Sequence, residues 1–180
     1  MTKNSIFEPF AKIALDAKNN ILTIEKKLIK TDDKNEKAVL KKQISGLKHL
    51  IDRSFRLTAD FLPVHASKKA KDYCEKNNLG DIYKVSWDKQ TEFEGKKSRK
   101  ECSLKHEHKI PVSNLIERLF GVSTVNEAIS IFESQEIVWV LKDEDKRLPK
   151  SKRKDSDEAY RLAEIEICKN PNTTGPLLVR

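Results

Sequence analysis

The first third of the chain repeats apolar residues at steps of three and four, which is the period of an amphipathic helix. The repeat stops at the polar residues 31–34 and then continues as far as Leu57. Because a turn this short joins antiparallel neighbours, the pattern predicts a helical hairpin over residues 1–62, with lysines on its outer faces. Ser5, followed three residues later by Glu8, is a candidate capping box for the first helix. The apolar positions are Ile6, Phe7, Phe10, Ile13, Ala14, Ala17, Ile21, Leu22 and Ile24, then Ala38, Val39, Leu40, Ile44, Leu47, Leu50 and Ile51.

After Pro63 the pattern becomes mixed, and we expect residues 63–168 to form a small α+β region packed with the hairpin into one unit. Short helices are predicted at residues 67–77, 114–120, 125–133 and 157–167, and a strand at residues 81–87. Residues 136–141 form the most apolar run, which fits a buried strand or the start of a buried helix. Residues 169–180 read as a flexible tail. The expected class is therefore α+β, mostly helical, with an N-terminal hairpin and a mixed C-terminal half.

The charge balance favours a polyanionic partner. Lysine and arginine number 36 against 28 aspartates and glutamates, giving a net charge of +8. Such a surplus is typical of proteins that bind nucleic acid, here most simply DNA, although solvation alone also explains lysines on an outer face. The basic run at residues 150–154 adds Lys150, Lys152, Arg153 and Lys154 as candidate phosphate contacts.

Other classes are disfavoured by the sequence. The first residues contain no apolar leader segment, and no run approaches the 18 apolar residues that a membrane helix requires. The three cysteines are widely spaced, which predicts neither a disulfide framework nor a zinc ribbon. We therefore expect a cytoplasmic protein with reduced thiols and no membrane partner; a homodimer or a larger protein partner stays open.

One short segment concentrates side chains that carry chemistry. Residues 103–112 contain His106, Glu107 and His108, and Pro111 follows. Imidazole and carboxylate groups together suit a general base or a divalent-cation site. On a regular strand, His106 and His108 would share one face and Glu107 would point to the other. A bend in the chain would be needed to bring Glu107 and His108 to one metal ion.

The motif E-H-x-I-P, at residues 107–111, resembles the first motif of the HNH, or ββα-metal, nucleases. The resemblance implies that Glu107 binds a divalent metal ion such as Mg²⁺, and that His108, with His106 as the other catalytic candidate, activates water. It also implies a middle asparagine, Asn114 or Asn126, and a last ligand, Asp145. The family's usual final histidine and its C-x-x-C pairs are absent, and the segment between residues 111 and 137 is longer than usual. The implied function is a metal-dependent DNA endonuclease, of a restriction or phage-conflict kind.

Three alternatives remain open. Asp81, Glu94 and Lys96 are similar to the D…E-x-K pattern of restriction-type nucleases, which also use a metal ion. Cys102 could join the two histidines in a zinc site. Finally, the histidine cluster could be structural, in a non-catalytic nucleic-acid-binding module or in an accessory or inhibitor protein that acts through its helical half.

Overall fold

The computed structural model describes residues 5–149, 153 and 155–171. The chain forms two compact units. The first, which we call the helical unit, combines the segment ending at Thr58 with Val112–Ser134. The second, the sheet unit, combines Ala59–Pro111 with the segment starting at Gln135. Residues 112–134 thus belong with the hairpin and not with the rest of the C-terminal half.

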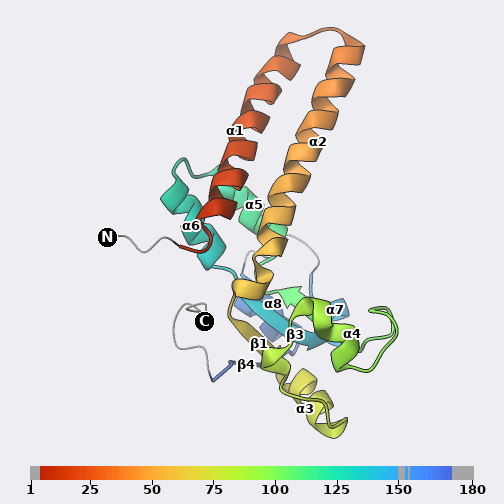
Figure 1. The fold of residues 1–180 in the computed structure, drawn as a ribbon. Coiled ribbons are helices and arrows are strands. Elements are labelled where there is room, and N and C mark those ends of the chain that lie inside the picture. The colour runs from red at the N-terminus through yellow and green to blue at the C-terminus, as the bar shows by residue number, and fades with distance from the viewer. Residues whose placement is uncertain (1–4, 150–152, 154, 172–180) are drawn as a thin grey trace. The chain divides into compact units, whose positions relative to one another are not determined.

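Two long helices form the predicted hairpin of the helical unit (Figure 1). Helix α1 spans Glu8–Lys30 and helix α2 spans Lys34–Leu57. Asp33 caps α2 by accepting hydrogen bonds from the main-chain amides of its first turn. The capping box expected at Ser5 does not form, because Phe7 occupies the N-cap position and makes no side-chain cap. The Ser5 hydroxyl instead donates a hydrogen bond to Glu133.

Two shorter helices complete the core of the helical unit. Helix α5 spans Val112–Phe120 and α6 spans Val125–Glu133. Phe132 of α6 stacks on Phe55 of α2, with ring centroids 4.2 Å apart and both side chains fully buried. Thr124 caps α6, and together with Glu127 it forms a capping box.

The sheet unit is built on four strands in the order β2-β3-β1-β4. Of the two structures left open for residues 136–141, a strand or a helix, the chain forms a strand, β3, inside this sheet. It pairs in parallel with β1 and antiparallel with β2, and β1 pairs antiparallel with β4. The bounds are β1, Val64–Ser67; β2, Leu104–His108; β3, Ile137–Leu141; and β4, Ile167–Cys168.

Short helices and turns surround the strands of the sheet unit. The helix predicted at residues 67–77 is present as α3, and Ser67 caps it by accepting a hydrogen bond from the main-chain amide of Ala70. The strand predicted at residues 81–87 is wrong: this stretch contains the 3-10 turn η2 and the first residue of η3. The remaining bounds are η1, Ala59–Phe61; α3, Lys68–Lys76; η2, Ile82–Lys84; η3, Trp87–Lys89; α4, Gln90–Phe93; α7, Lys142–Arg147; and α8, Ser156–Leu162.

Alternation along β3 divides the core of the sheet unit into two clusters. Trp139 belongs to the first cluster, which also contains Leu104 and residues of α3. Val138 and Val140 belong to the second, which also contains Leu148 and Tyr160. The sheet is thus covered by side chains on both faces, and any residue of β2 can be assigned to a face from its partner on β3.

The expected fold class is confirmed: the protein is α+β and mostly helical, with an N-terminal helical hairpin followed by a small mixed α/β part. Among the helices described, none is both long and apolar enough to cross a bilayer.

Candidate functional site on strand β2

Strand β2 carries the His106-Glu107-His108 segment as a regular five-residue strand. Every residue from Leu104 to His108 has a partner on β3, and no bulge interrupts the ladder. His106 pairs with Trp139, whereas Glu107 pairs with Val138. Directly paired residues share a face of the sheet, so the two histidines and Glu107 point to opposite faces. The bend that would bring Glu107 and His108 to one metal ion is absent from this strand.

The histidine face is partly buried and apolar. The His106 ring lies edge-on against Trp139, with centroids 4.8 Å apart, and 6.5 Å from the ring of His108. Burial lowers the pKa of His106 to about 3, and the nearby His108 and Lys105 act in the same direction. His106 is therefore neutral at physiological pH and can serve as a hydrogen-bonding or packing group, but it is a poor proton acceptor.

The opposite face holds Glu107 in a buried ion pair with Arg153. Arg153 Nη2 lies 2.7 Å from Glu107 Oε1, and the two side chains are only 1% and 19% exposed. The same guanidinium donates hydrogen bonds to the main-chain carbonyls of His108 and Lys109, each at 3.3 Å, and of Pro149, at 2.8 Å. Arg153 thus ties the end of β2 to the segment that follows α7.

This arrangement bears on the residues predicted to contact phosphate. Arg153 is 4% exposed and its N–H groups point into the protein, so it is placed to hold the fold and not to meet a phosphate on the surface. Its position in a lysine-rich run gives no hint of burial. Lys150, Lys152 and Lys154 lie outside the described residues.

Asp145, the predicted last metal ligand, lies on α7. Burial raises the pKa of the Tyr160 hydroxyl, and the charges of Glu107 and Asp145 raise it further, while Arg153 opposes them. The two carboxylates therefore act on the same hydroxyl, on the face of the sheet opposite to the two histidines. Asn114 and Asn126, the candidates for the middle residue, lie in the helical unit on α5 and α6.

Whether these residues can hold a metal ion depends on how many metal-binding side chains the fold brings together. Within the described part of the chain, no group of three or more histidine, cysteine, aspartate or glutamate side chains is placed to hold a metal ion. Glu107 already has a cationic partner, and the histidines face away from it. The residues present do not fit the metal centre that the nuclease resemblance implies.

The restriction-type alternative places Glu94 in a structural position. Its carboxylate is 7% exposed and accepts hydrogen bonds from the main-chain amides of Ser103 and Leu104 and from the Gln90 side chain. Asp81 caps η2 by accepting from the Tyr83 amide. A carboxylate saturated by protein donors has little capacity left for a cation, so Glu94 fixes the start of β2.

The zinc alternative also lacks support from the geometry. Cys102 is buried, and burial together with the charge of Glu94 raises the pKa of its thiol, which disfavours the thiolate that zinc requires. Its sulfur donates a weak hydrogen bond to the Ser98 carbonyl, at 3.6 Å.

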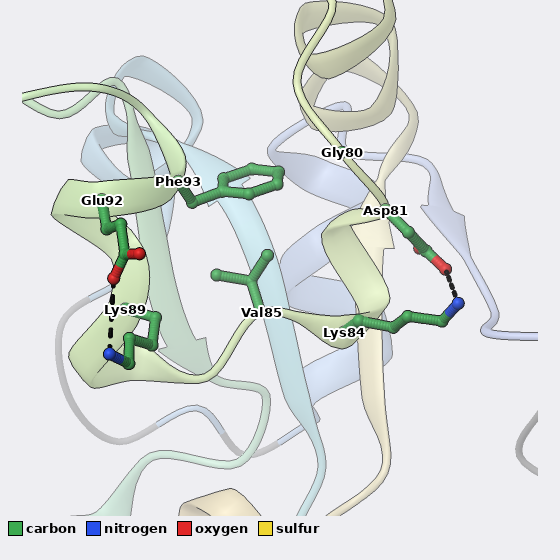
Figure 2. Close-up of a pocket in the computed structure, with 7 residues that line it drawn as sticks. All are labelled: Gly80, Asp81, Lys84, Val85, Lys89, Glu92 and Phe93. Atoms are coloured by element: carbon green, nitrogen blue, oxygen red, sulfur yellow. Dashed lines mark hydrogen bonds and ion pairs between the residues drawn. The ribbon is translucent and has the colours of Figure 1, made fainter.

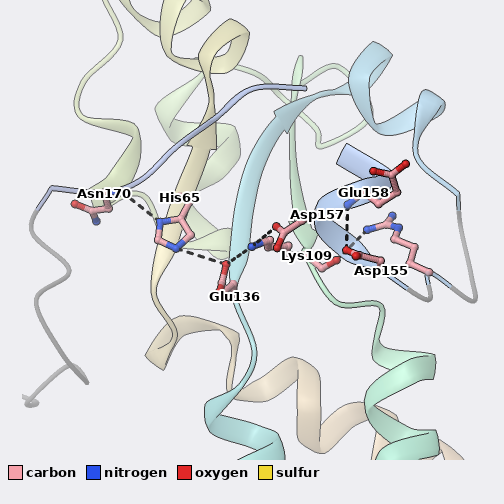
Figure 3. A network of polar contacts seen from close by, with 8 residues as sticks. His65, Lys109, Glu136, Asp155, Asp157, Glu158 and Asn170 are labelled. Carbon is pink, nitrogen blue, oxygen red and sulfur yellow. Dashed lines mark hydrogen bonds and ion pairs between the residues drawn. The ribbon is translucent and has the colours of Figure 1, made fainter. Parts of the chain in front are cut away.

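A second polar network lies where β2 ends and β3 begins (Figure 3). No sequence motif indicates it. Lys109 Nζ lies 2.9 Å from Glu136 and 2.8 Å from Asp157, and His65 Nε2 lies 3.8 Å from the same Glu136. His65 Nδ1 accepts a hydrogen bond from the main-chain amide of Asn170. These residues come from β1, the end of β2, the start of β3, α8 and the segment after β4, so only the folded sheet brings them together.

The protonation states of Lys109 and His65 follow from their burial and from the charges around them. Burial alone would lower the pKa of Lys109, but hydrogen bonds to Asp157 and Glu136 outweigh it and raise that pKa, so the ammonium is charged. Burial lowers the pKa of His65, and although Glu136 opposes this effect, Lys109 and Lys169 add to it. The network thus holds a charged lysine between two carboxylates beside a neutral histidine.

Comparisons of the chain with protein-family models, with curated proteins and with solved structures give no match.

Proposed function

We propose that this protein binds nucleic acid through the lysine-rich outer faces of the helical hairpin. The observation that carries the proposal is an excess of uncompensated positive charge. Residues 8–57 contain twelve lysines and arginines against seven aspartates and glutamates. Phosphate groups spaced along a nucleic acid would offset this excess and release counterions on binding.

Seven lysines of the hairpin helices are exposed and are not held by carboxylates of the part of the chain that the structure describes. Within the described residues, no ion pair is found for Lys26, Lys27, Lys30, Lys34, Lys41, Lys42 or Lys48, all of which are exposed. Nearby acidic groups are engaged otherwise: Asp33 caps α2, and Glu36 accepts a hydrogen bond from Thr31. The positive charge therefore faces solvent.

The spacing of these lysines suits an elongated anion. Lys34, Lys41 and Lys48 are seven residues apart on α2 and so share one face of the helix. At a rise of about 1.5 Å per residue, successive members stand about 10 Å apart along the axis, which allows contact with several phosphates. A single small anion would need the lysines gathered in one place.

The proposal is tested with a charge variant and a matched control. Replacing Lys34, Lys41 and Lys48 by glutamine should weaken binding to a labelled DNA duplex at low salt by tenfold or more, measured by fluorescence anisotropy. Replacing the exposed Lys69, Lys76 and Lys146 of the sheet unit removes the same charge elsewhere and should have a smaller effect. Equal losses would indicate non-directional attraction, and no binding by the wild-type protein would refute the proposal.

A metal-dependent endonuclease is a second candidate, favoured by one observation. The charges of Glu107 and Asp145 both raise the pKa of the Tyr160 hydroxyl, and Glu107 lies on the Tyr160 face of the sheet. Against it stand the ion pair of Glu107 with Arg153 and the placement of His108 on the other face. Cleavage of DNA by the wild-type protein with Mg²⁺, Mn²⁺ or Ni²⁺, abolished by His108→Ala in a folded variant, would favour the nuclease; no cleavage with any of the three would remove it.

A further inference from the structure

The sheet unit contains a pocket of about 440 Å³ between the end of α3 and α4 (Figure 2). This volume falls in the range of pockets that hold small molecules or single nucleotides, roughly 300–1,000 Å³. The walls come from the 3-10 turns that replace the predicted strand at residues 81–87. The pocket is lined by Gly80, Asp81, Lys84, Val85, Lys89, Glu92 and Phe93.

The middle of the pocket is apolar, and a planar ligand has room beside the Phe93 ring. Figure 2 shows the Val85 side chain and the Phe93 ring directed toward each other from opposite walls. Gly80 lies beside the ring: a Cβ atom at this position would stand 3.6 Å from Phe93 Cε2. The missing side chain at Gly80 thus leaves an edge of the ring uncovered, where a planar ligand can make apolar contact.

Each end of the pocket carries an ammonium group. Lys84 Nζ lies 3.7 Å from Asp81, and Lys89 Nζ lies 3.3 Å from Glu92. All four side chains are well exposed, and exposed ion pairs of this length are weak. Either lysine can therefore turn from its carboxylate to a phosphate at little cost.

A basic, aromatic surface continues from the pocket along the chain. Trp87, between Val85 and Lys89, is 46% exposed, and the Arg99 guanidinium lies 3.4 Å from the centre of its ring. Lys142 donates hydrogen bonds to the carbonyls of Arg99 and Lys100, at 3.1 and 2.7 Å, and so fixes the loop that carries them. Lys96, Lys97 and Lys100 are exposed on the same loop.

We infer that this pocket takes one unpaired base of a single-stranded nucleic acid, an inference that rests on the proposed nucleic-acid binding. The base lies between Val85 and Phe93, and the neighbouring phosphates meet Lys84, Lys89 and the basic loop. Aromatic rings beside a basic surface are the usual components of sites for single strands, because every base offers a face for stacking. A base inside a duplex is stacked on both sides and cannot enter.

The experiment compares a single strand with a duplex. Binding of a short oligothymidylate should quench the tryptophan fluorescence. The quenching is assigned to the exposed Trp87, because Trp139 is fully buried and cannot be reached. Gly80→Leu fills the space beside Phe93 from an exposed position, and Lys84→Gln with Lys89→Gln removes the ammonium groups. Gly80→Leu should lower affinity for the oligonucleotide by about tenfold, the effect of one lost stacking contact, and leave duplex binding unchanged. The lysine variant should lower affinity for the oligonucleotide through lost phosphate contacts and weaken duplex binding less.

Controls separate this inference from the proposed function. The hairpin variant at Lys34, Lys41 and Lys48 should weaken duplex binding and retain the quenching of Trp87 at high oligonucleotide concentration. If Gly80→Leu binds the single strand as tightly as the wild type, the pocket inference is wrong while nucleic-acid binding stands. If the wild-type protein binds neither the strand nor the duplex, both are wrong.

Discussion

Arg153 Nη2 lies 2.7 Å from Glu107 Oε1 with both side chains largely removed from solvent, so the only acidic residue of the His-Glu-His segment is already neutralised by the protein. The pair links strand β2 to the chain after α7, two segments that are 46 residues apart. The segment that resembles a metal-binding motif therefore holds two distant parts of the chain together.

This relationship predicts a large cost for removing one partner. Glu107→Ala would leave the Arg153 guanidinium buried without its carboxylate, and we expect a loss of about 3–5 kcal/mol in the free energy of unfolding. Urea denaturation at neutral pH measures it, with Glu75→Ala at an exposed position of α3 as the control. A loss under about 0.5 kcal/mol, the range of ordinary surface changes, would show that the pair is not needed.

The same ion pair predicts that replacing Arg153 lowers the stability of the fold more than replacing an exposed basic residue does. Arg153→Gln should destabilise the fold, because it removes the ion pair and hydrogen bonds to three carbonyls. Arg147→Gln, at an exposed position of α7, should leave the melting temperature nearly unchanged. If both variants melt alike, Arg153 does not perform the role assigned to it.

The partly buried His106 predicts a dependence of stability on pH. Its pKa is lowered to about 3 in the folded protein from the 6.5 of an unperturbed histidine, so between these values the unfolded chain binds more protons. Stability should therefore fall as the pH drops below 6.5, by up to about 1.4 kcal/mol per unit from this residue. His106→Phe keeps a ring against Trp139 and should flatten this part of the profile; an unchanged slope would place His106 in solvent.

The network at His65 predicts a change in the pKa of His65 that nuclear magnetic resonance can follow. Lys109→Met removes a positive charge that lowers the pKa of His65 and leaves Glu136, which raises it. The pKa of His65, read from its ring resonances against pH, should rise. Lys105→Met, at an exposed position of β2, serves as the control. A pKa that stays constant or falls in the Lys109 variant would mean that the two side chains are not coupled.

The sequence predicts the fold best where periodicity is long. Twenty or more residues at helical spacing on either side of a short polar break leave only a hairpin as a solution, and α1 and α2 confirm it. The four-residue strand β1 and the two-residue strand β4 are too short for any periodic signal, and β1 follows Pro63 closely, a position typical of a loop. Tertiary pairing creates both strands: β1 pairs with β3, and β4 pairs with β1.

The candidate site shows why spacing alone is insufficient. Alternation along a strand predicts that Glu107 and His108 diverge, and the ladder between β2 and β3 has this geometry. The partner of Glu107 could not be predicted, because Arg153 lies in a run that resembles a solvated linker. The pocket at Phe93 could not be predicted either, because residues 81–87 alternate like a strand and yet form the 3-10 turn η2, capped by Asp81, and the start of η3.

The most direct test of the central claim is the salt dependence of DNA binding. Affinity of the wild-type protein for a labelled duplex, measured by anisotropy between about 50 and about 200 mM salt, should fall steeply as counterions return to the phosphates. Each lysine that contacts a phosphate contributes about 0.9 to the slope, so the variant at Lys34, Lys41 and Lys48 should lose about 2–3 units of slope. A slope near zero for the wild type, or the same slope for wild type and variant, would contradict binding through the hairpin.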